Sequence, residues 1–267
     1  MEGRAGLASA LFALALGWAG LAFAAPPAEN QPFGDWAAVV IAGDFHGSRG
    51  GPTEVFDNAR RDVSKELQRI GFSPANMRQF SVQPDRYKDQ PLKADPRAIY
   101  KALNDLSGKT KAGCLVYFTS HGAPDGVVLD NKILTPVLLN RILDATCGAR
   151  PTVVIMSACF SGVFVPPLAG KNRMILTAAR RDRTSFGCGE DNIYPFFDDC
   201  VLKSSKATHD FITLASAVKT CVAQREVAEG MKPPSEPPAS TRRTRIFGSS
   251  LRRAARTHPA DPAPTTM

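Results

Sequence analysis

The chain has 267 residues and a formal net charge of +8. No segment after residue 24 approaches the length of a membrane span, and the six cysteines and four histidines do not have the spacing of a zinc site. These observations exclude a multi-span membrane protein and a zinc-finger scaffold. About two hundred residues between the two ends suffice for one domain with a substantial core.

Residues 1–24 have the pattern of a cleavable signal peptide. Arg4 lies in a short first region, residues 11–21 are apolar, and Ala22-Phe23-Ala24 is a small-x-small cleavage site. We therefore expect a cut after Ala24, a short linker over residues 25–35, and a secreted or periplasmic protein. The alternative is an uncleaved membrane anchor, for which the apolar core is too short.

Residues 232–267 differ in composition from the rest of the chain. They are rich in Pro, Ser, Thr and Arg, and their seven basic and two acidic residues supply five of the eight net charges. Such a segment buries too little apolar surface to fold, so we expect a disordered basic tail. It is either simply solvated or held electrostatically to anionic envelope surfaces. We expect no nucleic-acid partner, because the protein is predicted to be exported.

The segment 36–231 alternates between strand and helix patterns, which predicts a single α/β domain. Its mostly parallel sheet should carry helices on both faces. The predicted strands are 36–43, 77–82, 114–121, 153–156 and 172–179. The predicted helices are 53–70, 95–107, 135–147, 194–202 and 210–228, with a hairpin over 123–134.

Two of the predicted strands end in residues with catalytic chemistry. The segment 150–162 reads RPTVVIMSACFSG and places Cys159 just beyond a buried strand, and the segment 114–122 reads CLVYFTSHG and ends in His121-Gly122. In open α/β sheets, active sites lie at the carboxyl ends of the strands. A thiol acts as a nucleophile when a base such as imidazole removes its proton. Together the two motifs predict a cysteine nucleophile with a histidine partner.

Other interpretations of these residues stay open at this point. Cys159 alone would more often be a buried side chain or half of a disulfide. His46, in the glycine-rich loop 44–52, competes with His121 because that loop should lie at the same edge. An even number of cysteines in an oxidising compartment suggests disulfides, of which at most two can form if Cys159 stays free. Their pairing does not follow from spacing.

The motifs YFTSHG and VVIMSACFSG resemble the paired His-Gly and Ala-Cys motifs of the caspase-like cysteine peptidases, and are most similar to those of the legumain branch. AVVIAG, TAARRDRTSFGCG and YPFFDDC resemble further legumain segments, so the likeness extends over about 36–202. The resemblance implies a caspase-like fold, which is a three-layer α/β/α sandwich. It also implies a cysteine peptidase that uses neither metal nor cofactor.

The resemblance also implies roles for individual residues. Cys159 would be the nucleophile and His121 the general acid and base, with the backbone N–H groups of Gly122 and Cys159 as the oxyanion hole. The substrate pocket would be lined by Arg49, Ser157, Thr184 or Ser185, and Asp199.

Two departures from the legumain pattern limit what the resemblance implies. Legumains carry a glutamate where this chain has Ser157, and the loop after the first strand differs in length here. The group that orients the histidine and the residue preference at the cleaved bond therefore stay open.

The expected function is that of an exported cysteine endopeptidase, which cleaves peptides or proteins through a thioester intermediate. One alternative is a transpeptidase or transamidase that uses the same thioester. Another is a non-catalytic binding module with all its cysteines in disulfides. An α/β-hydrolase is disfavoured, because no GxSxG motif is present. The oligomeric state is not predicted.

Overall fold

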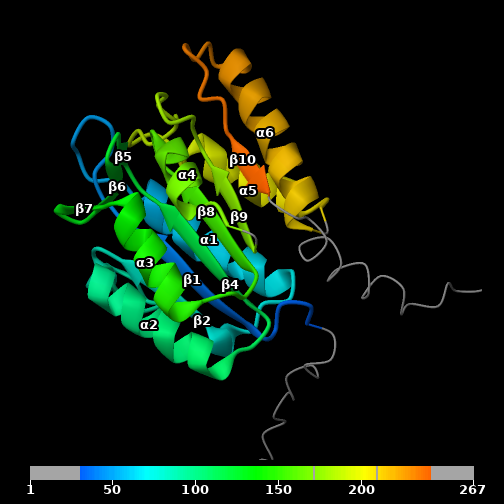
Figure 1. The fold of residues 1–267 in the computed structure, drawn as a ribbon. Helices are drawn as coiled ribbons and strands as arrows, with labels where there is room; N and C mark the ends of the chain where they lie inside the picture. The colour runs from blue at the N-terminus through cyan, green and yellow to red at the C-terminus, as the bar shows by residue number, and fades with distance from the viewer. Residues whose placement is uncertain (1–30, 171, 209, 242–267) are drawn as a thin grey trace, which may run out of the picture.

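The computed structural model describes residues 31–170, 172–208 and 210–241. The predicted signal peptide, most of the predicted linker and residues 242–267 of the predicted tail lie outside the described residues. Within them, a central sheet is covered by helices on both faces, so the predicted three-layer α/β/α sandwich is confirmed (Figure 1).

Seven strands form the central sheet, in the order β10-β9-β8-β4-β1-β2-β3. All neighbouring strands run parallel except β10, which pairs antiparallel with β9. The strands are β1 (Trp36–Ala42), β2 (Met77–Ser81), β3 (Leu92–Lys93), β4 (Gly113–Thr119), β8 (Thr152–Ser157), β9 (Arg173–Thr177) and β10 (Ala239–Thr241). A separate small sheet consists of β5 (Gly122–Ala123), β6 (Gly126–Leu129) and β7 (Lys132–Leu134).

The helices divide between the two faces of the sheet (Figure 1). One face is covered by α2 (Pro96–Lys109), α3 (Pro136–Thr146) and the short α4 (Val165–Leu168). The other is covered by α1 (Val55–Arg69), α5 (Phe196–Ser205) and α6 (Phe211–Ala228). Three 3₁₀ turns lie in connections: η2 (Pro74–Asn76), η3 (Pro84–Arg86) and η4 (Ser161–Phe164).

Side-chain caps set the starts of three of the described α-helices. Asp95 accepts hydrogen bonds from the first free N–H groups of α2, and Asp210 does the same for α6. Thr135 caps α3 in the same way, with Pro136 at the first helical position. The helix predicted over 53–70 begins two residues later, as α1, and the hydroxyl of Thr53 accepts from the N–H of Val55 without capping the helix.

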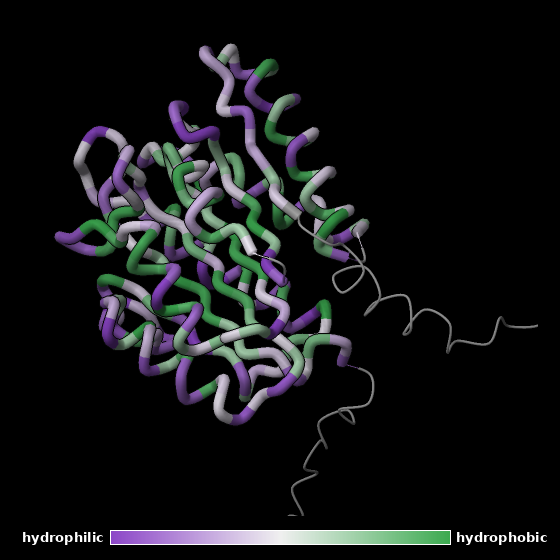
Figure 2. Tube along the Cα trace, in the orientation of Figure 1, coloured by the Kyte–Doolittle hydropathy of each residue, from purple (hydrophilic) through white to green (hydrophobic). Residues whose placement is uncertain are grey.

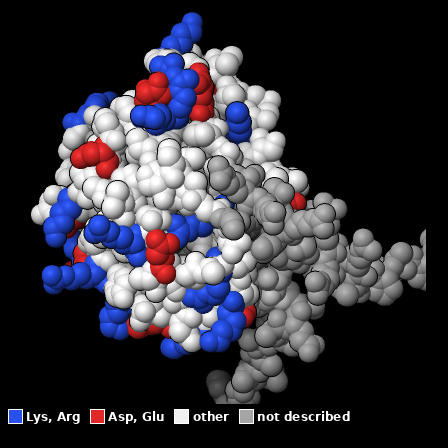
Figure 3. All heavy atoms as spheres, in the orientation of Figure 1, with Lys and Arg blue, Asp and Glu red and all other residues white. Residues whose placement is uncertain are grey.

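Strand alternation builds two cores, one on each face of the sheet. In β1, Val39 and Ile41 belong to the cluster beneath α2 and α3, whereas Ala38 and Val40 belong to the cluster beneath α1, α5 and α6. Figure 2 shows the apolar strands at the centre of the molecule. Charged side chains of both signs are spread over the face with α2 and α3 (Figure 3).

The folded domain extends beyond both predicted boundaries. Phe33, in the predicted linker 25–35, is 2% exposed and stacks on Phe72 with ring centroids 4.7 Å apart. After α6, the chain returns along β9 as β10, and Ser235 is fully buried. The prediction that disorder begins at residue 232 is therefore wrong for 232–241. Backbone pairing with an open sheet edge orders that segment without large apolar side chains.

Two disulfides link neighbouring elements. Cys114 on β4 pairs with Cys147 after α3, and Cys200 on α5 pairs with Cys221 on α6. Cys159 and Cys188 are free. This matches the limit of two bridges expected if Cys159 is not used. None of the described helices is long and apolar enough to cross a membrane.

Candidate active site

The strands that carry the two catalytic motifs are neighbours. β4 and β8 pair in parallel with Thr119 opposite Ser157, and His121 and Cys159 each follow two residues later. A methyl group on Gly122 would overlap the carbonyl oxygen of Cys159, so the backbones of the two motifs touch. Glycine is required at this position because no side chain fits.

His121 is held by a backbone acceptor. Its Nε2 lies 2.9 Å from the carbonyl oxygen of His46, and the edge of Phe56 packs against its ring with 5.1 Å between centroids. Since a carbonyl oxygen only accepts hydrogen bonds, Nε2 carries a proton and Nδ1 is free in the neutral ring. The group that orients His121, which the sequence did not reveal, is therefore the His46 backbone.

Asp44 shapes the turn that presents this carbonyl. Its Oδ1 accepts from the backbone N–H groups of Phe45 and His46, at 2.7 and 3.1 Å, and lies 2.8 Å from Nδ1 of the His46 ring. This is an Asx-type turn closed by a side chain. His46, a rival of His121 in the sequence, contributes its main chain to the site while its ring pairs with Asp44.

The Cys159 thiol lies against Ser185. Its Sγ is 3.3 Å from the backbone nitrogen of Ser185 and 3.6 Å from the hydroxyl oxygen. The backbone N–H of Ser185 therefore donates a hydrogen bond to the sulfur. Ser185 was expected to line the substrate pocket, and the structure places it on the thiol itself. Thr184, the neighbouring candidate, is exposed in the same loop.

The turn after Cys159 is tightly constrained. Phe160 adopts a left-handed conformation, with φ of 56°, and its N–H donates to the carbonyl of Arg183 over 2.8 Å. The backbone of Gly162 lies so close to Arg181 that a side chain would clash. The small residues after Cys159 therefore let the segment 179–183 approach. Among the described residues, the N–H of Cys159 has no hydrogen-bond acceptor.

Arg49 connects two loops at this edge of the sheet. Its guanidinium lies 3.1 Å from a carboxylate oxygen of Glu190 and 3.1 Å from one of Asp191, and its side chain is 68% exposed. The N–H of Ser48 donates to the carbonyl of Cys188. The glycine-rich loop and the loop after β9 therefore meet, as the pocket prediction requires. Sequence reasoning missed both carboxylates, although they directly follow the segment TAARRDRTSFGCG.

Ser157 does not line a pocket, contrary to prediction. It is 2% exposed, and its hydroxyl donates to Oδ2 of Asp198 over 2.8 Å. Side chains alternate along β8, and position 157 faces α5 rather than the open edge.

Asp199 is also placed differently from expectation. Its carboxylate pairs with Lys203 at 2.7 Å and with Arg225 at 2.5 Å. It lies in a hollow between α1 and α5, whose lining includes Tyr194 but neither Cys159 nor Ser185. The acid next to the catalytic strands is Asp198. An (i, i+4) pair such as Asp199–Lys203 is typical of a solvent-facing helix position and could have separated the two aspartates.

The second free thiol, Cys188, differs from Cys159 in its surroundings. Cys188 packs against the small cluster of Ala42, Val55 and Phe56, and burial, followed by the nearby Cys159, raises the pKa of its thiol to about 11. At neutral pH it is therefore a thiol and a poor nucleophile.

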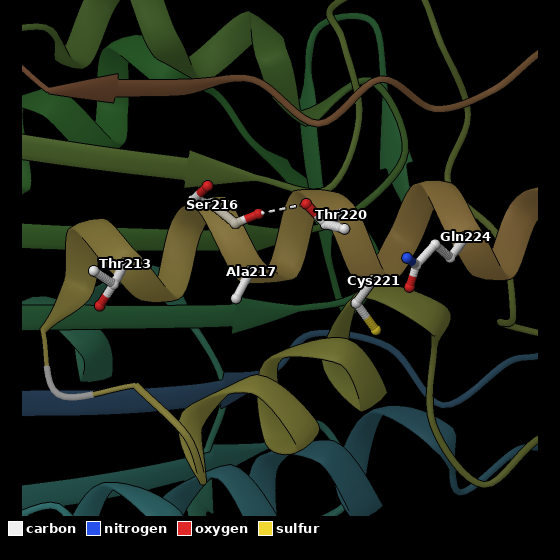
Figure 4. Close-up of a pocket in the computed structure, with 6 residues that line it drawn as sticks. All are labelled: Thr213, Ser216, Ala217, Thr220, Cys221 and Gln224. Carbon is white, nitrogen blue, oxygen red and sulfur yellow. Dashed lines mark hydrogen bonds between the residues drawn. The ribbon is translucent and has the colours of Figure 1, made fainter.

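Other features of the described surface do not belong to this site. No group of three or more His, Cys, Asp or Glu in the described ranges could hold a metal ion. A further hollow follows one face of α6, far along the chain from the catalytic motifs (Figure 4). Its lining consists of Thr213, Ser216, Ala217, Thr220, Cys221 and Gln224.

Comparison with known proteins agrees with this fold. The crystal structure of caspase-1 from Spodoptera frugiperda superposes with a TM-score of 0.58 at 15% sequence identity, covering 83% of this chain and 92% of that chain. At this identity the likeness establishes the caspase-like fold alone. No curated protein matches.

A caspase-like sandwich with a free cysteine and a histidine at adjacent strand ends defines a class, the clan CD cysteine peptidases. A model of the peptidase C13 family matches residues 72–236. The chain belongs to the peptidase C13 family, the legumain family, and is therefore a cysteine peptidase acting on peptide or protein substrates.

Proposed function

We propose that Cys159 is the nucleophile and His121 the general acid and base of an endopeptidase. The main support for these roles is the hydrogen bond from His121 Nε2 to the His46 carbonyl. It leaves Nδ1 unprotonated and able to act as the base. The pairing of β4 with β8 supports the proximity of the two side chains.

The proposed reaction has two halves. Nδ1 of His121 takes the proton from Sγ of Cys159, and the thiolate adds to the peptide carbonyl carbon. The tetrahedral oxyanion collapses to a thioester while His121 returns the proton to the leaving amine. In the second half, His121 removes a proton from water and the resulting hydroxide adds to the thioester carbonyl carbon. The C–S bond breaks, Sγ leaves as thiolate and regains the proton from His121, and the acid product leaves.

The proposed oxyanion hole consists of the N–H groups of Gly122 and Cys159. The unpaired N–H of Cys159 supports its part, since a free donor at the nucleophile is available for a developing negative charge. The contact between Gly122 and the Cys159 backbone supports the part of Gly122.

The proposed substrate pocket lies between the loop 44–52 and the loop after β9. Arg49, Thr184 and Ser185 remain the candidates for its lining. Arg49 is already neutralised by Glu190 and Asp191, which favours neutral or basic side chains over carboxylates at the cleaved bond.

We also propose that the protein is exported after cleavage behind Ala24. The two disulfides support this, because such bridges persist in oxidising compartments. Mass spectrometry of the protein recovered from the medium or periplasm tests it, with a mature N-terminus at Ala25 expected. Export would be rejected if the protein were found only in the cytoplasm and still carried residues 1–24.

The catalytic proposal is tested with a biotinylated peptide acyloxymethyl ketone, carrying mixed residues next to the electrophile. We expect stoichiometric labelling at Cys159 in the wild type and in Cys188→Ala, which serves as the matched control. Labelling should be lost in Cys159→Ala and strongly reduced in His121→Ala. Equal labelling of the wild type and both site variants would reject the assignment.

A further inference from the structure

Asp198 is a buried carboxylate that the proposed mechanism does not use. It lies on α5 with none of its surface exposed. The hydroxyl of Tyr117 donates to Oδ1, and the hydroxyls of Thr119 and Ser157 donate to Oδ2 over 2.8 Å each. Three side chains from β4 and β8 are therefore tied to a single carboxylate.

Two of these donors occupy matching positions next to the catalytic pair. Thr119 and Ser157 are opposite each other in the β4–β8 register. His121 follows Thr119 by two residues, and Cys159 follows Ser157 by two. One oxygen atom bonded to both hydroxyls fixes the spacing of the two strand ends, and charge-assisted hydrogen bonds of this kind are short and directional.

The carboxylate is an unfavourable group to bury at this position. Burial raises the pKa of Asp198 to about 6, against the lowering effect of the three hydroxyl donors. Among the described residues, no cation pairs with Asp198. Arg225 pairs with the neighbouring Asp199 instead. A carboxyl whose pKa rises on folding weakens the folded state. The penalty is complete above about pH 6 and shrinks as the pH falls from there towards the ordinary pKa of 3.8.

Other ionisable groups surround Asp198. The phenol of Tyr117 on β4 stays protonated, because burial and then Asp198 raise its pKa well above the ordinary value. Asp199 is the neighbour on α5, and its charge raises the pKa of Asp198 further. The other charged groups near this part of α5 gather around Asp199. Arg225 from α6 pairs with Asp199, and Asp62, Glu66 and Arg69 of α1 line the same hollow as Asp199.

We propose that Asp198 is a positioning residue, which holds the ends of β4 and β8 at the spacing that proton transfer from Cys159 to His121 requires. The inference rests on the proposed roles of these two residues. A positioning residue is expected to lower the stability of the fold while it fixes the geometry of the active site, as the buried charge of Asp198 does.

The isosteric variant Asp198→Asn tests the proposal. Its amide accepts at one atom and donates at the other, so it cannot accept from all three hydroxyls. We expect kcat for a peptide selected from a random library to fall about 10- to 100-fold, with KM changed less than about threefold. We also expect Tm at about pH 7.5 to equal or exceed that of the wild type, because the buried charge is gone.

The pH profile provides a readout that a purely structural role would not change. Below about pH 6 the wild-type carboxyl is itself neutral, so the ratio of wild-type to variant kcat should shrink as the pH falls from about 7.5 to about 5. The difference in Tm between variant and wild type should shrink over the same interval.

The matched control is Asp57→Asn. Asp57 is also buried, at 2% exposure, and accepts a hydroxyl hydrogen bond from Ser81 over 2.9 Å, but it braces β2 rather than the catalytic strands. This variant should lower Tm, because Arg60 loses one of its two carboxylate partners, without changing kcat per folded molecule. If Asp198→Asn does not fold, Ser157→Ala removes one tie and should lower kcat in the same direction.

Three outcomes would overturn the positioning role. These are an unchanged kcat in folded Asp198→Asn, a loss of kcat that only follows the loss of folded protein, and a wild-type to variant ratio that is constant with pH. Cys159→Ala is measured in parallel. Full turnover by that variant would reject the proposed function itself, whereas its inactivity beside a fully active Asp198→Asn would reject only the present inference.

Discussion

The two sides of the candidate site are held by different kinds of interaction. Beneath Cys159 and His121, the strand ends are fixed by sheet pairing and by hydroxyl groups bonded to a buried carboxylate. The neighbouring loops are joined by ion pairs of Arg49, whose side chain is 68% exposed. Solvent weakens exposed ion pairs far more than buried hydrogen bonds.

Because the strand ends are held more firmly than the loops, the catalytic chemistry and the substrate preference depend on different parts of the site. Moving the strand ends would disturb the sheet and both cores, whereas the pocket loops can change in length and charge while the sheet stays intact. The loop after β1 departs from the legumain pattern in its length, whereas the Cys and His positions are kept. The other departure, Ser157, lies with the strand ends. We expect variants of the two regions to differ accordingly.

The largest effect is expected for Gly122→Ala. Its methyl group would overlap the Cys159 carbonyl, so the backbone at the proposed oxyanion hole must move. We predict a fall in kcat/KM of about 10³-fold or more, measured with the library-derived peptide. The control is Gly108→Ala on α2, where a methyl group meets open space and should leave activity unchanged. Wild-type kcat/KM in Gly122→Ala would contradict the rigidity of this contact.

Loss of the Cys200–Cys221 disulfide should have the next largest effect. The bridge closes a loop with a sequence separation of 21 residues and links α5, which carries Asp198, to α6. We predict that the double variant to alanine loses about 2–4 kcal/mol of unfolding free energy in urea titration. The molecules that remain folded should keep their kcat. A kcat that falls while the protein is fully folded would show that α6 itself tunes the site.

A moderate effect is expected for Asp44→Ala. The variant removes the acceptor that shapes the turn, so the His46 carbonyl no longer fixes His121. We predict a fall in kcat of about 10- to 30-fold with a smaller change in KM. Asp44→Asn keeps an acceptor oxygen and should retain most of the activity. Equal losses in the two variants would indicate that the charge, and not the turn, matters.

The smallest effect on folding is expected for Arg49→Ala. Its ion pairs are exposed, so Tm should change by less than about 2 °C. The cleavage profile of a peptide library should shift instead, because Glu190 and Asp191 lose their partner and attract basic side chains. A large fall in Tm with an unchanged cleavage profile would contradict this prediction, because it would show that Arg49 stabilises the fold and does not affect substrate preference.

Sequence patterns correctly predicted the parts of the fold that are determined by neighbouring residues in the chain. The apolar runs before Cys159 and His121 form neighbouring strands, and the Asp-Pro and Thr-Pro pairs begin helices where predicted. These features depend on backbone chemistry within a few residues. The family resemblance added the fold, which matches the structure.

Features that depend on long-range contacts did not follow from the sequence. The choice between Asp198 and Asp199 depends on how α5 is rotated against the sheet. The orientation of Ser157 depends on which face of β8 meets that helix. The acceptor for His121 is a main-chain carbonyl, which every residue possesses, so no side-chain pattern could identify it.

The short strand β10 has a consequence for synthesis of the chain. It closes the β9 edge with residues far later in the sequence than β9 itself, so that edge stays open until residues 239–241 have been made. Until then β9 exposes unpaired N–H and C=O groups, to which a strand of another molecule can add. Truncation before residue 239 should therefore yield a protein that aggregates through β9, even with the whole catalytic region intact.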